Sequence, residues 1–130
     1  LTSSNGTGDC SGRVPYLTDH LVVEDNCADM NLPTVALFYD GNYVDIAENC
    51  NAEAYNIKRH LEKYGFGVVL LHQLNDFPAW SNALANVDFL IMPKLESGDF
   101  MAGLNAAPAV KGLLTTYVTL NHGKVLWFGA

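Results

Sequence analysis

The chain has 130 residues, is 49% hydrophobic and carries a net charge of −7, with fourteen acidic residues against seven basic ones. This length and apolar content suit a single domain with a buried core. The acidic balance argues against nucleic acid or an anionic membrane surface as a partner, because phosphate binding needs clustered Lys and Arg. No apolar run approaches the roughly 20 residues that cross a bilayer, so we expect no membrane insertion.

Residues 1–33 are predicted to form an extended N-terminal arm. Its polar start contains the triplet Asn5-Gly6-Thr7, which makes Asn5 a glycosylation candidate if the protein is secreted. A disulfide between Cys10 and Cys27 is predicted within the arm, closing a loop of about 18 residues. Cys50 is expected to be a free, buried thiol. The cysteine pair and the polar start favour an extracellular, oxidising setting over three unrelated cytosolic thiols.

Residues 34–130 are predicted to form an α/β domain, beginning after Pro33. Short apolar runs at 34–40, 67–72, 89–92 and 124–128 predict strands that are covered on both faces. Amphipathic segments predict helices over about 51–64, from Asp76 to Val87, and from Pro108 to the glycine at 123. Strands that alternate with helices indicate a four-stranded parallel sheet with right-handed crossovers. We expect strand order 2-1-3-4, with helices on both faces.

Two strand segments resemble those of class I glutamine amidotransferase-like domains. Val87-Asp88-Phe89-Leu90-Ile91-Met92-Pro93 resembles the family's third strand, and His122-Gly123-Lys124-Val125-Leu126-Trp127 resembles the strand that leads to its nucleophile. The loop segments at 39–45 and 93–99 resemble a variant found as a module inside secreted bacterial surface proteins. The resemblance implies a flavodoxin-like fold and, in complete members, amide or peptide hydrolysis.

This sequence departs from the catalytic pattern of that family. Gly129 and Ala130 stand where a nucleophile elbow would follow the last strand, and no Gly-x-Cys-x-Gly or Gly-x-Ser-x-Gly occurs. Pro93 is followed by Lys94-Leu95-Glu96 rather than a glycine pair, which restricts backbone N–H groups from turning toward an oxyanion. The resemblance is therefore to a degenerate member, and we expect no catalytic residue.

Ligands of open parallel sheets bind beyond the carboxyl ends of the strands, where the strand order reverses. Here that crevice is expected between the first and third strands. The candidates are Asp40, Asn42, Asp45 and Glu48 on one side, and Lys94, Glu96 and Asp99 on the other. Ca²⁺ could be held by Asp40, Asp45, Glu96 and Asp99. The spacing is not that of an EF-hand, and solvated acidic loops with Lys94 as counter-ion are the simpler interpretation.

The sequence favours a non-catalytic extracellular structural or interaction module, and a self-assembling filament or surface-layer subunit is one form of it. Its partner would be another copy or another surface protein. The alternative is a small amidotransferase-like hydrolase or ligand-binding domain that uses the crevice. The last strand is expected at an edge of the sheet, where its apolar row Val125-Leu126-Trp127-Phe128 forms a template for another strand. Residues 17–24 read as an extra strand, which could pack on a neighbouring copy or fold back on its own domain and cover that edge.

Overall fold

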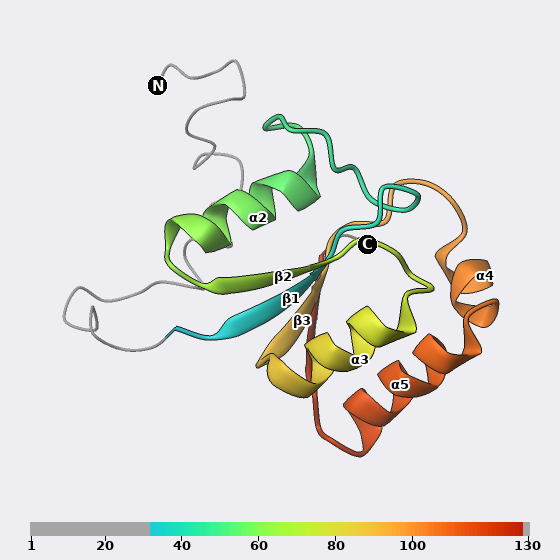
Figure 1. The fold of residues 1–130 in the computed structure, drawn as a ribbon. Coiled ribbons are helices and arrows are strands. Elements are labelled where there is room, and N and C mark those ends of the chain that lie inside the picture. The colour runs from blue at the N-terminus through green and yellow to red at the C-terminus, as the bar shows by residue number, and fades with distance from the viewer. Residues whose placement is uncertain (1–31, 129–130) are drawn as a thin grey trace.

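The computed structural model describes residues 32–128, coloured in Figure 1. The elements are β1 (Thr34–Phe38), α2 (Glu53–Lys63), β2 (Gly67–Leu71), α3 (Phe77–Asn86), β3 (Phe89–Met92), α4 (Phe100–Asn105), α5 (Pro108–Thr119) and β4 (Lys124–Trp127). The predicted Cys10–Cys27 bridge, the Asn5 triplet and the strand at 17–24 lie outside the described residues.

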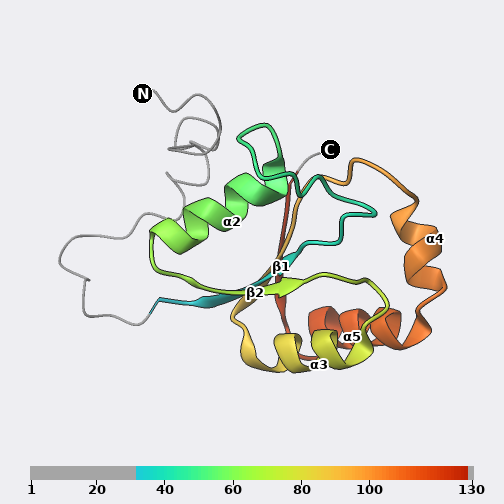
Figure 2. The same ribbon diagram turned by 45° about the horizontal axis from the view of Figure 1, so that its top comes forward.

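The four described strands form one parallel sheet in the order β2-β1-β3-β4, as the sequence predicts. Helix α2 lies on one face of the sheet, whereas α3 and α5 lie on the other (Figures 1 and 2). The predicted α/β fold with helices on both faces is therefore confirmed. The strand order reverses at β1, because β2 pairs with one side of β1 and β3 pairs with the other. Strand β4 lies at an edge of the sheet, next to β3.

The ends of the helices follow local chemistry that can be read from the sequence. Asp76 accepts a hydrogen bond from the N–H of Ala79 at 3.2 Å, which caps α3. Gly65 has a φ of +87° just after α2, a conformation that glycine adopts without strain. Helix α4 was not predicted, because its six residues are too short to show a helical period.

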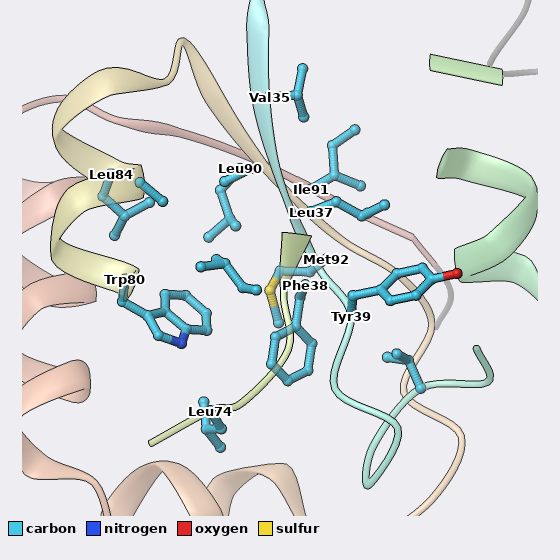
Figure 3. Close-up of a cluster of buried hydrophobic side chains, with 14 of the residues drawn as sticks. Val35, Leu37, Phe38, Tyr39, Leu74, Trp80, Leu84, Leu90, Ile91 and Met92 are labelled. Atoms are coloured by element: carbon cyan, nitrogen blue, oxygen red, sulfur yellow. The ribbon is translucent and has the colours of Figure 1, made fainter. Parts of the chain in front are cut away.

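The core is formed by buried side chains on both sides of β1, which pack against the helices that cover the two faces of the sheet. In Figure 3, Phe38 and Trp80 lie on one side of β1, and Leu37 and Tyr39 point to the other side, where α2 lies. The Trp80 side chain is fully buried, its ring centroid 5.8 Å from that of Phe38, and its indole N–H donates to the Gln73 carbonyl at 3.0 Å. Packing and hydrogen bonding together fix the loop after β2.

Among residues 32–128, no helix has the length and apolar character that crossing a bilayer requires.

Candidate functional site

The loop after β1 and the loop after β3 are joined by hydrogen bonds at the carboxyl ends of the strands. The Tyr43 carbonyl accepts from the N–H groups of Glu96 at 2.7 Å and Ser97 at 3.3 Å. The Ser97 hydroxyl donates to the Asn42 carbonyl at 3.1 Å. Gly98 has a φ of +67°, and a Cβ there would lie 2.7 Å from the Asn42 carbonyl oxygen, so only glycine fits. The two predicted sides of the crevice therefore do meet.

Asp40 anchors this end of the sheet. Its side chain is 4% exposed, one carboxylate oxygen accepts from the N–H of Asn42 and the other from the N–H of Leu74, each at 2.9 Å. The second bond ties the end of β1 to the loop after β2. Because both oxygens already accept backbone hydrogen bonds, the carboxylate has a positioning role in the fold.

The remaining candidate acids are spread along the rim of the sheet. Asp45 accepts from the N–H of Ala47 at 3.0 Å, Asp99 caps α4 through the N–H of Ala102, and Glu48 and Glu96 are exposed. No group of three or more His, Cys, Asp or Glu among residues 32–128 is placed to hold a metal ion. The described residues therefore do not form the calcium site considered from the sequence.

The loop after β3 uses its backbone N–H groups within the fold. The Lys94 N–H donates to the Glu53 carboxylate in the first turn of α2 at 2.5 Å, and the N–H groups of Glu96 and Ser97 donate to the Tyr43 carbonyl, as described above. These three donors hold the loop after β3 to α2 and to the loop after β1.

A shallow hollow of about 400 Å³ lies where the crevice between β1 and β3 is expected. It brings together Asp45 and Glu96, one from each predicted side, with apolar atoms of Val44 and Ile46 between them. It does not include Asp40, Asn42, Glu48, Lys94 or Asp99.

A larger cavity, of about 480 Å³, lies toward the β1–β2 side and was missed by sequence reasoning. It is lined by Asp40, Asn42, Tyr43, His72, Gln73, Leu74, Asn75, Gly103 and Ala106. Gly103 lets α4 approach, because a Cβ there would meet the Tyr43 hydroxyl and the Leu74 side chain. The polar run that directly follows β2 was the available signal. It was passed over because the expected crevice lies at the order reversal.

A chain of aromatic rings leads from this cavity to β4. Phe100, at the start of α4, lies 5.9 Å from Tyr43, 5.5 Å from Phe38 and 6.2 Å from Trp127, measured between ring centroids. All three pairs are edge-to-face, an arrangement that adds favourable electrostatics to the apolar contact.

The outer edge of β4 exposes both backbone and side chains. The Phe128 N–H donates to the Met92 carbonyl at 2.9 Å. Since alternate residues of a parallel strand direct their backbone groups to the same side, Val125 and Trp127 direct their N–H and C=O groups away from β3. Their side chains are 37% and 51% exposed. The predicted apolar edge is thus present.

Tyr39 follows β1 and points toward α2 (Figure 3). Burial, reinforced by the nearby negative charge of Glu48, raises the pKa of its hydroxyl to about 12. Its phenol is therefore neutral at physiological pH.

Cys50, just before α2, is disulfide-bonded in the structure. The prediction that it is a free thiol is therefore wrong. The sequence grouped cysteines by their position along the chain, whereas a bridge depends on distance in space. Cys10 and Cys27, the other two cysteines of the chain, lie outside the described residues. Because a thiol forms a single bridge, a bond from Cys50 to either of them would exclude the predicted Cys10–Cys27 bridge.

No family model, curated protein or solved structure matches this chain. The amidotransferase-like resemblance therefore stays an interpretation of the sequence.

Proposed function

We propose that this domain is a non-catalytic interaction module of an extracellular protein, and that it self-associates through β4. The observation that carries the proposal is the outer edge of β4, whose outward backbone groups pair with no other strand among residues 32–128 and which carries two exposed apolar side chains, Val125 and Trp127. Such an edge is a template for a further strand.

A second copy fits this edge by symmetry. If two β4 strands pair antiparallel around a twofold axis at Leu126, each Val125 lies opposite the other copy's Trp127. The outward N–H and C=O groups of these residues are then the ones that an antiparallel ladder uses. Their side chains lie on the same face, and an aromatic residue opposite a β-branched one contributes about 0.2–1 kcal/mol per pair. The two sheets would join into one, through an isologous contact.

Two observations support the other parts of the proposal. The bridge at Cys50 favours an extracellular location, because disulfides persist mainly in oxidising compartments. The backbone donors after β3 and the carboxylate of Asp40 are engaged within the fold, which favours a structural over a catalytic role for the strand ends.

Sedimentation velocity over a range of concentrations tests the self-association. We expect Val125→Lys to shift the chain to monomer, because a charge then sits in the paired strands. Val69→Lys is a matched control: Val69 lies on the opposite edge strand, on the same sheet face, and is 38% exposed against 37% for Val125. A wild type that stays monomeric, or two variants that behave alike, would contradict the proposal.

A second candidate function is binding of a small neutral polar molecule in the 480 Å³ cavity. The walls carry the carboxamides of Asn42, Gln73 and Asn75 and the imidazole of His72, and no Lys or Arg of the described residues lines the cavity. Such walls suit hydroxyl-rich ligands such as saccharides better than anions. NMR titration with neutral mono- and disaccharides would move the amide signals of these residues. We expect Asn42→Ala to weaken binding and Asn121→Ala, at the exposed end of α5, to leave it unchanged.

A further inference from the structure

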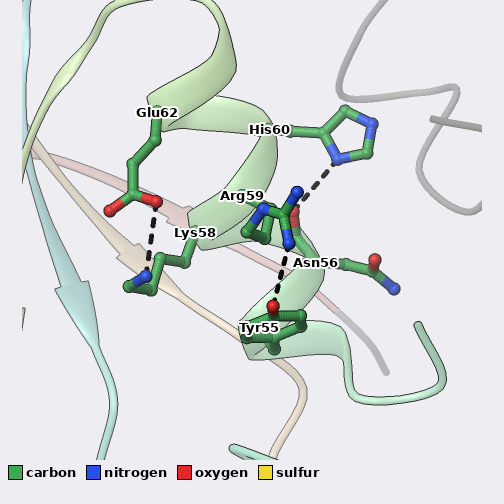
Figure 4. A network of polar contacts seen from close by, with 6 residues as sticks. All are labelled: Tyr55, Asn56, Lys58, Arg59, His60 and Glu62. Atoms are coloured by element: carbon green, nitrogen blue, oxygen red, sulfur yellow. Dashed lines mark hydrogen bonds and ion pairs between the residues drawn. The ribbon is translucent and has the colours of Figure 1, made fainter. Parts of the chain in front are cut away.

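Helix α2 buries two polar side chains on its flank. Its apolar residues Ala54, Ile57 and Leu61 pack in the core, yet Asn56 is only 4% exposed and His60 only 3%. Figure 4 shows both side chains projecting from the opposite side of the helix to Lys58 and Glu62, which form an exposed ion pair at 3.3 Å. Polar groups this deeply buried are normally paired, because losing water without gaining a partner is costly.

Each of the two side chains has one polar atom that remains unpaired. The Asn56 amide nitrogen donates to the Cys50 carbonyl at 2.6 Å, and His60 Nδ1 lies 3.0 Å from the Asn56 carbonyl. A carbonyl only accepts, so Nδ1 is the donor of this pair, and the tautomer with its proton on Nδ1 presents Nε2 as an acceptor. Asn56 Oδ1 and His60 Nε2 have no hydrogen-bond partner among the described residues. The flank therefore presents two buried acceptors.

The neighbouring half of the sheet is apolar on the same face. By strand register, Phe89 and Ile91 of β3 and Leu126 of β4 point to the face where α2 lies. A helix about 10 Å across covers roughly two strands spaced about 4.8 Å apart, and α2 packs mainly against β2. Ile91 is nevertheless fully buried, and Phe89 and Leu126 are partly buried. In Figures 1 and 2, α2 is the one labelled helix on this face.

The bridge at Cys50 indicates what covers this face of the sheet beside α2. Cys50 is bonded, and the chain's other cysteines, Cys10 and Cys27, both belong to the 31 residues that precede the described ones. A bridge to either brings that segment to the start of α2, where Asn56 contacts Cys50. The segment also contains both kinds of side chain that this face requires, hydrogen-bond donors and apolar groups. Donors for the two acceptors are available from Thr2, Ser3, Ser4, Asn5 and Thr7, and apolar side chains for the sheet from Leu17, Leu21, Val22 and Val23.

We propose that residues 1–31 of the same chain bind to the face of the sheet beside α2, over the β3–β4 half. The disulfide of Cys50 tethers the segment, Asn56 Oδ1 and His60 Nε2 accept its hydrogen bonds, and its apolar residues cover Ile91. The arm then lies on its own domain but does not cover the edge of β4, which stays available to a second copy.

Hydrogen exchange on the intact, oxidised chain tests the proposal. We expect amides within residues 1–31 to exchange on the order of tenfold or more slowly than in an unstructured peptide, at every protein concentration. His60→Phe keeps the ring but removes the acceptor, and Cys50→Ser removes the tether. Both should lower this protection, while Glu62→Gln, on the exposed flank, should not.

Amides of α2 and the strands serve as the folding control in each variant, and peptide mapping without reduction identifies the partner of Cys50. The proposal is overturned if residues 1–31 exchange as an unstructured peptide in the wild type. It is equally overturned if their protection falls on dilution, since the segment would then bind a second copy. A Cys50 found unbridged, or His60→Phe behaving as Glu62→Gln does, would also refute it.

Discussion

Replacing Asp40 by Asn should show what its buried hydrogen bond from Leu74 contributes to stability beyond its local bond from Asn42. The Asp40 carboxylate accepts two backbone hydrogen bonds at 2.9 Å while 4% exposed. A carboxamide has one acceptor oxygen, so its NH₂ group must face one of the two N–H donors. One charge-assisted bond is lost and one buried donor is left unpaired. We expect the free energy of unfolding to fall by about 2–3 kcal/mol.

Asp45→Asn is the matched control for this change. Asp45 also accepts from the N–H two residues ahead, at 3.0 Å, but it is exposed and an asparagine can make the same bond. Its cost should stay within about 0.5 kcal/mol. Urea unfolding, followed by fluorescence of the buried Trp80, measures the free energy of unfolding of both variants. The Tm of Asp40→Asn should fall by roughly 10 °C. If both substitutions cost the same, the bond from Asp40 to Leu74 contributes nothing, and the account of this anchor is wrong.

Three further outcomes follow from packing and charge. Gly103→Ala should lower the free energy of unfolding by about 1–3 kcal/mol, because the added Cβ meets the Tyr43 hydroxyl. The Cβ of Gly112→Ala meets nothing, so this variant should stabilise α5 by about 0.5–1 kcal/mol. Urea unfolding that ranks the two variants otherwise contradicts the packing. Trp80→Ala should cost about 3–5 kcal/mol in the same assay, since the side chain is fully buried. The Tyr39 hydroxyl has a folded-state pKa raised from 10.0 to about 12, so the unfolded chain loses this proton first. Stability should therefore fall as pH rises between these values. Ultraviolet titration should show Tyr39 among the tyrosines that ionise late, together with Tyr117, whose pKa burial also raises. Ionisation of Tyr39 near its ordinary value would refute its burial.

The sequence predicts the sheet order and most elements because their signals are local. Apolar runs of strand length, Asp76 before a helix and Gly65 after one each act within a few residues. The candidate site was harder to predict. Asp40 was correctly placed at a strand end, but its bond to Leu74 spans 34 residues and no local pattern encodes it.

The buried flank of α2 illustrates the same limit. On a helical projection Asn56 and His60 fall beside charged residues, which predicts solvent exposure. Their burial depends on what packs on the helix, which periodicity does not report. The disulfide of Cys50 is a relation of the same kind.

Phe100 contacts both the wall of the cavity and the edge of the sheet at β4. Its ring contacts Tyr43 in the cavity wall and Trp127 at the edge, so the two surfaces share one side chain in a close-packed layer. Thermodynamic reciprocity then applies: a molecule in the cavity that strengthens self-association through β4 must itself bind the assembled form more tightly, by the same factor.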